Sequence, residues 1–219
     1  MDELPALTHE TLSASVYGAL CEALMQGRFK PGDRLKIREL AARLQTSVTP
    51  VRDAVIRLVQ DEALVFRSAR DIRIPLIGRE RYLEIRGIRL RLEGLAAEEA
   101  AARVSAAELE ALRALLDANE AAMRAGDWLA ALAANQAFHF ELANIARMPV
   151  LSAMLQRLWL QMGPLIAQAY IAGGRAMIDH HYPVVEALRR RDPQGAAAAI
   201  QRDIIEGGGS ILALLPAGP

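Results

Sequence analysis

Residues 37–58 decide the fold of the N-terminal part of the chain, and they read IRELAARLQTSVTPVRDAVIRL. Apolar residues recur at helical spacing up to Leu44 and again from Val51 onward. The polar residues 45–47 separate these two stretches and are few enough to form a turn. Two short helices joined by a turn of three or four residues make a helix-turn-helix, whose second helix can enter the major groove of DNA.

The flanks of this segment extend it to a winged domain. Before it, apolar residues recur at helical spacing between residues 12 and 24, and glycine and proline residues then end that helix. After it, residues 64–74 alternate like the two strands of a hairpin that turns at residues 68–71. A helix, a helix-turn-helix and a hairpin in this order predict a winged helix-turn-helix DNA-binding domain over residues 1–76.

The remainder of the chain is predicted to be helical, without strand signals. The change falls at residues 74–78, where Pro75 and Gly78 interrupt the helical pattern. Helix starts are marked by a capping box at residues 105–108 and by Asp127, Pro149 and Asp192. The fold class is therefore mainly α, with an all-helical ligand-binding bundle over residues 79–215 after the winged domain. Its six expected helices lie near residues 79–103, 105–125, 127–146, 149–172, 175–191 and 193–214.

The composition is that of a globular protein of a reducing compartment. Of the 219 residues, 53% are hydrophobic and 24% are charged, which excludes a disordered chain. The single cysteine, Cys21, cannot form an intramolecular disulfide, and no export signal begins the sequence, so we expect a cytoplasmic location. The longest uncharged stretch, residues 158–174, is shorter than the about 20 mostly apolar residues that span a membrane. We therefore expect no membrane association.

Positive charge gathers in the predicted DNA-binding part, although the net charge of the chain is zero. Residues 28–73 contain 11 Lys or Arg and 6 Asp or Glu. In the second helix of the helix-turn-helix, Ser47 or Thr49 can cap the N-terminus and Arg52 projects outward, while Arg38 lies on the preceding helix. Arginine binds guanine O6 and N7 with two hydrogen bonds and also binds phosphates. The segment predicts double-stranded DNA as the partner.

The order and spacing of these motifs resemble the winged-helix domain of GntR-type bacterial transcription regulators. The resemblance covers about 45 residues and rests on PGDRL at 31–35, RELAARL at 38–44 and SVTPVRDA at 47–54. It implies DNA contacts by Arg38, Thr49 and Arg52, and the candidate DNA-binding residues are these three and Ser47. The chain departs from the family at Val48, where an arginine usually reads a base, and in the wing, which is short and lacks its usual glycine.

The helical half carries a second set of candidate residues. Asn135 and His139 are four residues apart on an apolar helix and therefore point the same way. With HYPVVEALRRRD at residues 181–192, this half resembles the ligand-binding FCD domain of the FadR-type branch of GntR regulators. In metal-binding members, an Asp and a His four apart join two further His. The resemblance implies a metal site of Asn135, His139, His181 and Asp203, with Asn135 in place of the family Asp and Asp203 in place of a His.

These four residues form an unusual donor set. Two His and one carboxylate can bind Zn, Ni, Mn or Fe and leave positions open for a chelating ligand. Asn135 offers only a neutral oxygen, and Asp203 is shorter than an imidazole, so a water can bridge it to the metal. We expect a divalent metal site weaker than the family norm. The alternative is a pair of hydrogen-bonded histidines that hold no metal.

The resemblance also assigns a role to Arg89, which matches a family arginine that faces the cavity. Its guanidinium would hold the carboxylate of a small organic acid effector with two hydrogen bonds; the alternative is a surface charge. We expect a ligand-responsive transcription regulator, a repressor, that binds a near-palindromic operator as a homodimer. A DNA-binding protein whose bundle only dimerises is the alternative, and a metal-dependent enzyme is less favoured. Because no P-loop, G-x-G-x-x-G motif or catalytic triad is recognisable, we expect no enzyme activity.

Overall fold

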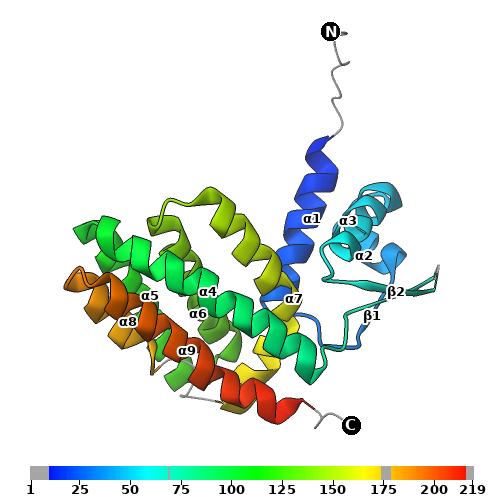
Figure 1. Ribbon diagram of the computed structural model, residues 1–219. Helices are drawn as coiled ribbons and strands as arrows, with labels where there is room; N and C mark the ends of the chain where they lie inside the picture. The colour runs from blue at the N-terminus through cyan, green and yellow to red at the C-terminus, as the bar shows by residue number, and fades with distance from the viewer. Residues whose placement is uncertain (1–9, 69, 174–178, 216–219) are drawn as a thin grey trace. The chain divides into compact units, whose positions relative to one another are not determined.

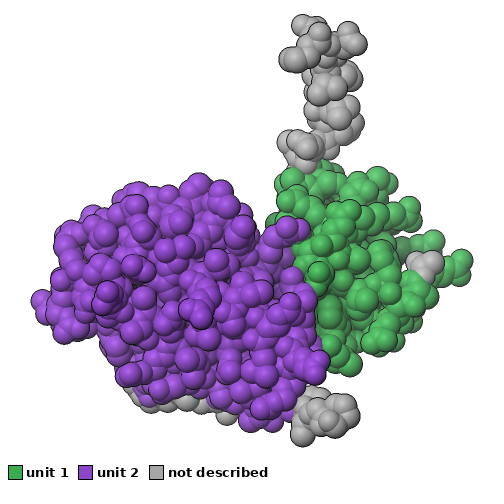
Figure 2. Space-filling model, viewed as in Figure 1, with its two compact units in different colours: residues 1–24, 28–76 green, residues 25–27, 77–219 purple. Residues whose placement is uncertain are grey.

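The computed structural model describes residues 10–68, 70–173 and 179–215. The chain divides into two compact units, one of residues 1–24 and 28–76 and the other of residues 25–27 and 77–219 (Figure 2). Among the described residues, the first unit contains three helices and a small sheet, and the second contains six helices (Figure 1). The fold is mainly helical, which confirms the fold class predicted from the sequence.

The first unit is a winged helix-turn-helix. Its sheet has the strand order β1-β3-β2 and is antiparallel throughout, with Arg73 opposite both Arg34 and Val65. The sequence predicts only the β2–β3 hairpin, because β1 has two residues and is too short for an alternating pattern. The elements are α1 (Glu10–Met25), β1 (Arg34–Leu35), α2 (Ile37–Arg43), α3 (Val48–Gln60), β2 (Val65–Ser68) and β3 (Asp71–Arg73).

The turn between α2 and α3 orients the second helix of the pair. Gln45 has a φ of 51°, in the left-handed region that commonly ends a helix and redirects the chain. Along α3, Val51, Val55 and Leu58 are fully buried. The opposite face of α3 is exposed. The helix is therefore anchored by one apolar face and presents the other outward.

The described residues of the second unit form a bundle of six helices, as the sequence predicts. Helix α5 begins with the predicted capping box, in which Ser105 Oγ accepts from the Glu108 amide at 3.2 Å and the Ser105 amide donates to Glu108 at 2.8 Å. The carboxylates of Asp127 and Asp192 cap α6 and α9. The helices are α4 (Arg79–Arg103), α5 (Ala106–Ala125), α6 (Trp128–Ile145), α7 (Pro149–Gly173), α8 (His181–Arg189) and α9 (Pro193–Leu214).

Helix α8 is shorter than the expected helix over residues 175–191. Asp179 and His180 form a turn, and α8 begins at His181, while residues 174–178 lie outside the described part of the chain. This start places Pro183 in the first turn, where its missing N–H needs no helical partner. A helix from residue 175 would put Pro183 in its interior and lose a hydrogen bond. At the other end, the φ of 52° at Arg191 prevents the helix from continuing.

Helices α4 and α9 pack closely through small residues. The Tyr82 hydroxyl donates to the Gly208 carbonyl at 3.1 Å, and a Cβ on Gly208 would meet the Tyr82 oxygen at 2.4 Å. This close approach brings the inner face of α4 against the middle of α9. The main apolar core of the bundle includes Ala97, Ala100, Ala101, Leu112, Phe138, Leu142, Val184, Leu188 and Ile200.

Candidate functional site

The exposed face of the helix-turn-helix carries all four candidate DNA-binding residues. Arg38 lies on α2, Ser47 precedes α3, and Thr49 and Arg52 lie on the first two turns of α3; all four are exposed. Ser47 occupies the N-cap position by its backbone, but its side chain makes no capping hydrogen bond. The expected side-chain cap is therefore absent, and the Ser47 hydroxyl is available to another partner.

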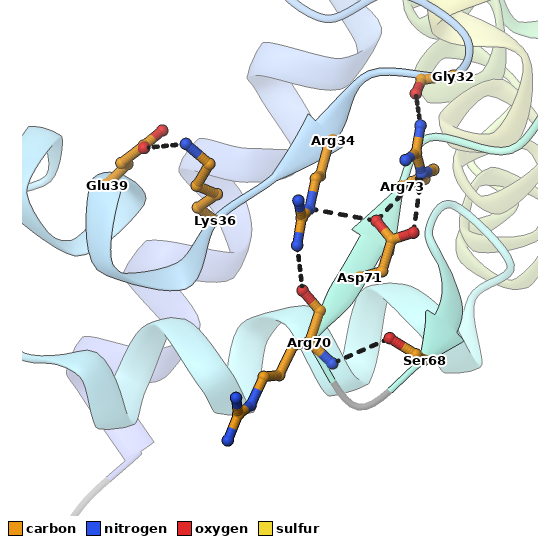
Figure 3. Close-up of polar contacts among 8 residues, drawn as sticks. All are labelled: Gly32, Arg34, Lys36, Glu39, Ser68, Arg70, Asp71 and Arg73. Carbon is orange, nitrogen blue, oxygen red and sulfur yellow. Dashed lines mark hydrogen bonds and ion pairs between the residues drawn. The ribbon is translucent and has the colours of Figure 1, made fainter.

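The guanidinium groups of Arg38 and Arg52 on this face are not neutralised by any described residue. Among the residues that the structure describes, neither Arg38 nor Arg52 forms an ion pair or a hydrogen bond through its side chain. By contrast, Lys36 beside them pairs with Glu39 at 2.6 Å (Figure 3). A free guanidinium on an exposed helix face can contact either phosphates or base edges.

Polar side chains from four helices meet inside the bundle. Arg89 and Glu93 come from α4, Asn135 and His139 from α6, His181 from α8 and Asp203 from α9. All six are buried, and His181 is 0% exposed. Such a concentration of charged and polar groups in an apolar interior is costly unless each group has a partner. The sequence-predicted residues Asn135, His139, His181 and Asp203 thus lie in one region of the bundle.

The carboxylate of Asp203 bridges the two histidines. His139 Nε2 lies 3.3 Å from Asp203 Oδ2, and His181 Nε2 lies 3.3 Å from Asp203 Oδ1. One donor atom from each of these three residues can be chosen so that all lie within 4.8 Å of one another. Ligand atoms bound to one tetrahedral zinc are about 3.4 Å apart, given Zn–N and Zn–O distances of about 2.1 Å.

His181 supplies an independent reason to consider a metal. Its buried Nδ1 makes no hydrogen bond with any described residue, and its buried Nε2 lies 3.3 Å from Asp203 Oδ1 without the geometry of a hydrogen bond. A buried polar atom without a partner costs about 1–3 kcal/mol, and native proteins contain few of them. A metal at His181 Nε2 would satisfy one of the two nitrogens. His139, His181 and Asp203 therefore fit a divalent cation.

Glu93 contacts His139 at the ring nitrogen that does not face Asp203. Its Oε2 lies 2.6 Å from His139 Nδ1, and its Oε1 accepts hydrogen bonds from Arg89 Nε at 2.6 Å and from Trp159 Nε1 at 3.1 Å. A carboxylate on the far nitrogen of a histidine fixes the tautomer that leaves the other nitrogen free for a metal. No sequence motif points to Glu93 or Trp159 as part of the site. The available signal was spacing: Glu93 is four residues after Arg89 and shares its helix face.

The charges of the cluster shift one another's pKa values. Burial alone would raise the pKa of Glu93, but the Arg89 guanidinium and His139 outweigh it and lower that pKa to about 2. Burial would lower the pKa of His139, but the carboxylates of Glu93 and Asp203 raise it to about 9. For Asp203, the effect of burial is outweighed by His181 and His139, which hold its pKa well below its usual range. Without a metal, His139 is therefore an imidazolium between two carboxylates.

A small cavity adjoins the cluster. It is lined by Arg89, Asn135, His139, Asp203 and neighbouring apolar residues, and its volume is about 30 Å³. This is about the volume of one water molecule in the liquid, so the cavity in this conformation has room for a water or an ion but not for an organic acid. Arg89 is among the residues that line the cavity. However, its Nε is already bound by Glu93, and only the outer nitrogens remain without a described partner.

Comparison with known proteins identifies the class to which this architecture belongs. Residues 12–74 match the model "Bacterial regulatory proteins, gntR family", and residues 84–205 match the FCD domain. McbR, an HTH-type transcriptional regulator of Escherichia coli (strain K12), is 32% identical over 193 residues, which cover 86% of this chain and 87% of McbR. A protein of Paenarthrobacter nicotinovorans, named "Probable D-xylose utilization operon transcriptional repressor", is 29% identical over 203 residues, or 90% of this chain and 88% of that protein.

Solved structures agree with these matches. The structure of E. coli McbR/YncC is 30% identical and superimposes with a TM-score of 0.86, covering 92% of this chain and 97% of that chain. A GntR regulator from Rhodococcus sp. RHA1 has the same fold at 19% identity, with a TM-score of 0.79 and 93% and 99% coverage. The protein is a DNA-binding transcription regulator rather than an enzyme.

The chain belongs to the GntR family of bacterial regulatory proteins, in the FadR-type branch that carries an FCD domain. This confirms the resemblance drawn from the sequence. Among the described residues, no helix is long and apolar enough to cross a membrane.

Proposed function

We propose that the protein is a cytoplasmic repressor that binds a near-palindromic operator as a homodimer and responds to a small organic acid. Residues 1–76 act as the DNA-binding domain, and residues 79–215 act as the effector-binding and dimerisation domain. The free, exposed Arg52 beside Ser47 and Thr49 at the start of α3 carries the operator proposal. The relative from Paenarthrobacter nicotinovorans is named a repressor, which supports repression as the direction of control.

In this proposal, α3 of each protomer enters one major groove. Arg52 reads a base edge, Thr49 and Ser47 donate hydroxyl hydrogen bonds, and Arg38 on α2 contacts a phosphate. Val48 provides no hydrogen bond where the family usually has an arginine, so one base contact is replaced by an apolar one, such as contact with a thymine methyl. The half-site therefore differs from those of regulators that carry the arginine.

The homodimer proposal has support in the bundle. Ile88 and Leu95 on α4 are 42% and 38% exposed, and Val150 and Met154 on α7 are 70% and 52% exposed. Helices α4 and α7 pack against each other. Large apolar side chains exposed on neighbouring helices are typical of a protein interface. Charge introduced by Ile88→Glu is expected to weaken dimerisation, measured by light scattering after size-exclusion chromatography.

In the bundle, His139, His181 and Asp203 hold a divalent ion, with Asn135 beside them. The ion is Zn, Ni, Mn or Fe, since two His and one carboxylate suit all four. When bound, it supplies a Lewis-acidic centre for an effector oxygen. Glu93 orients His139, and His139 must lose its proton to bind the ion.

The charge of the loaded cluster favours an anionic effector. With a divalent ion bound and His139 neutral, the positive charges of the ion and Arg89 outnumber the negative charges of Glu93 and Asp203 by one. The metal-bound cluster therefore has a net charge of +1. A monocarboxylate that chelates the ion and accepts from the outer nitrogens of Arg89 would balance this charge. Binding requires the cavity to expand well beyond its volume of about 30 Å³.

The effector would control DNA binding if it bound one arrangement of the two protomers more tightly than the other. A ligand shifts an equilibrium only by its difference in affinity for the two states. Expansion of the cavity against α4, which carries Arg89, would move the linker at residues 74–79 and alter the spacing of the two α3 helices. Operator affinity that stays constant with every acid that binds the bundle would contradict this mechanism.

The metal content of the purified protein tests the effector site. About one equivalent per chain, measured by mass spectrometry, is expected in the wild type and in His180→Ala, and none in His139→Ala/His181→Ala. The small cavity favours a second candidate function, in which the bundle serves only for dimerisation. That alternative predicts no metal and no acid binding in any variant, with operator binding unchanged.

A further inference from the structure

Helix α9 contains three consecutive glycines, Gly207, Gly208 and Gly209, although the helix continues beyond them to Leu214. After proline, glycine is the residue least favourable in a helix interior, because it loses the most backbone freedom on folding. Each of the three therefore weakens the helix compared with alanine. A cost repeated at three successive positions requires a reason in the surroundings of this glycine triplet.

Packing against α4 explains one of the three glycines. The start of α4 lies beside the end of α9 (Figure 1), and the Tyr82 hydroxyl donates to the Gly208 carbonyl at 3.1 Å. A Cβ on Gly208 would collide with this hydroxyl. Gly209 is exposed, and a Cβ there would meet no atom of the described residues within 4 Å. Packing therefore does not explain Gly209, where alanine would fit and would strengthen the helix.

The triplet also forms part of the wall of the small cavity beside the candidate metal ligands. Gly207, Gly208 and Ile211 line this cavity from α9, and Tyr82 and Arg89 line it from α4. With a volume of about 30 Å³, the cavity admits no organic acid unless one of its walls moves. The wall formed by α9 is the one whose backbone the glycines weaken.

The part of α9 that follows the triplet has few buried side chains. Among residues 210–214, all of which the structure describes, only Ile211 is buried. Before the triplet, by contrast, Ile200, Asp203 and Ile204 are buried along the helix. Segments with few buried contacts open at a lower free energy than the core of a protein. Residues 210–214, the terminal segment, can therefore separate from the bundle while the rest of α9 stays in place.

We propose that the glycine triplet is the hinge of a gate, through which the terminal segment swings away from α4 and opens the cavity to the ion and the acid. The inference rests on the metal and effector site proposed above and adds the route by which that site is reached. Hinges are often small residues that absorb the change in backbone angles. Tyr82 is the latch, because its hydroxyl ties Gly208 to α4 in the closed state.

The latch also connects the gate to the control of DNA binding. Tyr82 lies in the first turn of α4, which begins at Arg79, directly after the linker at residues 74–79. When an acid enters and the gate opens, the hydrogen bond from Tyr82 to Gly208 breaks, and the start of α4 loses its attachment to α9. The cavity and the linker are thereby joined through one hydrogen bond.

Hydrogen exchange, followed by mass spectrometry of the full-length metal-free protein, tests the gate without any ligand. The amides of residues 210–214 should exchange together and roughly tenfold faster than those of residues 200–204 in the same helix. Gly209→Ala should slow exchange in the terminal segment about threefold to fivefold, because alanine favours the helix. Gly208→Ala should speed it, since the new Cβ pushes against Tyr82. Two adjacent substitutions of the same type thus have opposite expected effects.

Two further variants separate a gate from simple fraying of the helix end. Gly18→Ala is the matched control, because Gly18 is an exposed glycine within α1 whose added Cβ also meets no described neighbour within 4 Å. It should leave exchange at residues 210–214 unchanged. Tyr82→Phe removes the latch hydrogen bond and should speed this exchange. The gate is overturned if Tyr82→Phe has no effect, or if Gly208→Ala and Gly209→Ala shift the exchange in the same direction.

The release of Zn²⁺ connects the gate to the site. His139, His181 and Asp203 are buried, so even a small ion needs an opening to leave them. Mixing the Zn²⁺-loaded protein with excess chromophoric chelator gives the release rate, which should not depend on the chelator concentration. Gly209→Ala should slow release about threefold to fivefold and leave the dissociation constant unchanged, because a gate slows entry and exit equally. A changed dissociation constant with an unchanged release rate contradicts the gate.

The two experiments distinguish failure of the gate from failure of the metal site. If no variant binds Zn²⁺, the proposed metal site fails, and hydrogen exchange still decides whether the terminal segment opens at the triplet. If Zn²⁺ binds but leaves every variant at the same rate, the gate fails and the metal site stands.

Discussion

The helix-turn-helix and the bundle place the guanidinium group of arginine in opposite environments. Arg38 and Arg52 are exposed and unpaired among the described residues, whereas Arg89 is 6% exposed and bound at 2.6 Å by Glu93. An exposed cation costs nothing to keep and is ready for an external polyanion. A buried cation must be neutralised by the protein itself, and its removal leaves a buried partner behind. Position in the fold therefore decides whether the whole guanidinium of an arginine is available to an external partner or part of it is bound inside the protein.

The largest difference between the two regions is expected in how much the loss of one arginine lowers the free energy of unfolding. Arg89→Ala leaves Glu93 with one strong donor fewer in the interior and should lower the free energy of unfolding by about 3–5 kcal/mol. Arg52→Ala should change it by less than about 0.5 kcal/mol. Urea denaturation of both variants at one protein concentration measures the contrast. Arg89→Ala/Glu93→Gln should recover part of the loss, and equal effects of the two single variants would contradict the comparison.

The pH dependence of stability should come from the bundle. The pKa of His139 is raised from 6.5 to about 9, so its stabilising contribution is complete below pH 6.5 and is lost as the pH rises through about 9. In metal-free protein, the loss should be on the order of 2–3 kcal/mol. Urea denaturation at pH 6.5 and pH 9.5 measures it. His139→Gln should remove the dependence and His180→Gln should keep it; a wild type of constant stability over this range would disprove the charged His139.

Specific DNA affinity should depend on the exposed arginines and not on other surface cations. Arg52→Ala should weaken binding to an operator selected from random duplexes by about 1–3 kcal/mol and relax the preference at one base pair. Arg113→Ala, which removes an exposed arginine from α5, should have no effect. Fluorescence anisotropy with labelled duplexes at a fixed salt concentration gives both values. A uniform loss on all sequences with Arg52→Ala would reassign Arg52 to a phosphate.

An effect of similar size is expected at Glu93, which supports the metal ligand His139. Glu93→Gln keeps the shape of the side chain but removes the charge that orients His139, and should weaken Zn²⁺ binding about 10–100-fold. Competition with a chromophoric chelator measures this affinity. His180→Gln is again the control, because His180 pairs with Glu206 at 2.9 Å, outside the cluster. Zn²⁺ affinity that is unchanged in Glu93→Gln would limit Glu93 to a structural ion pair.

Local sequence patterns predicted most of the fold. The helix-turn-helix and the bundle helices follow from apolar spacing and from caps such as Ser105 and Asp192, which act within one turn. Strand β1 was missed because its two residues are defined only by pairing with β3. The expected start of α8 was wrong, since α8 begins at His181. The spacing of apolar residues gave no reason to begin the helix just before Pro183, although proline is tolerated only in the first turn.

The candidate site was predictable only in part. Asn135, His139, His181 and Asp203 could be named from family motifs, but their distances depend on how four helices pack. Glu93 had no motif, and its role arises from contacts with His139 on α6 and Trp159 on α7, which are remote in sequence. The hydrogen bond from Arg89 to Glu93 joins residues four apart on α4, so spacing along one helix could have indicated it. Charges inside a bundle are matched in three dimensions, which spacing along one helix does not encode.

The position of Trp159 gives the cluster an optical signal. Its indole ring lies 5.0 Å from the His139 ring and 4.3 Å from the Arg89 guanidinium carbon, and the sequence contains only one other tryptophan. An open-shell ion such as Ni²⁺ or Mn²⁺ at His139 would quench the emission of Trp159 at this range, whereas closed-shell Zn²⁺ would leave it bright or shift its wavelength. The chain therefore contains its own fluorophore for titrating the site, and Trp159→Phe, which keeps only the emission of the other tryptophan, is the reference.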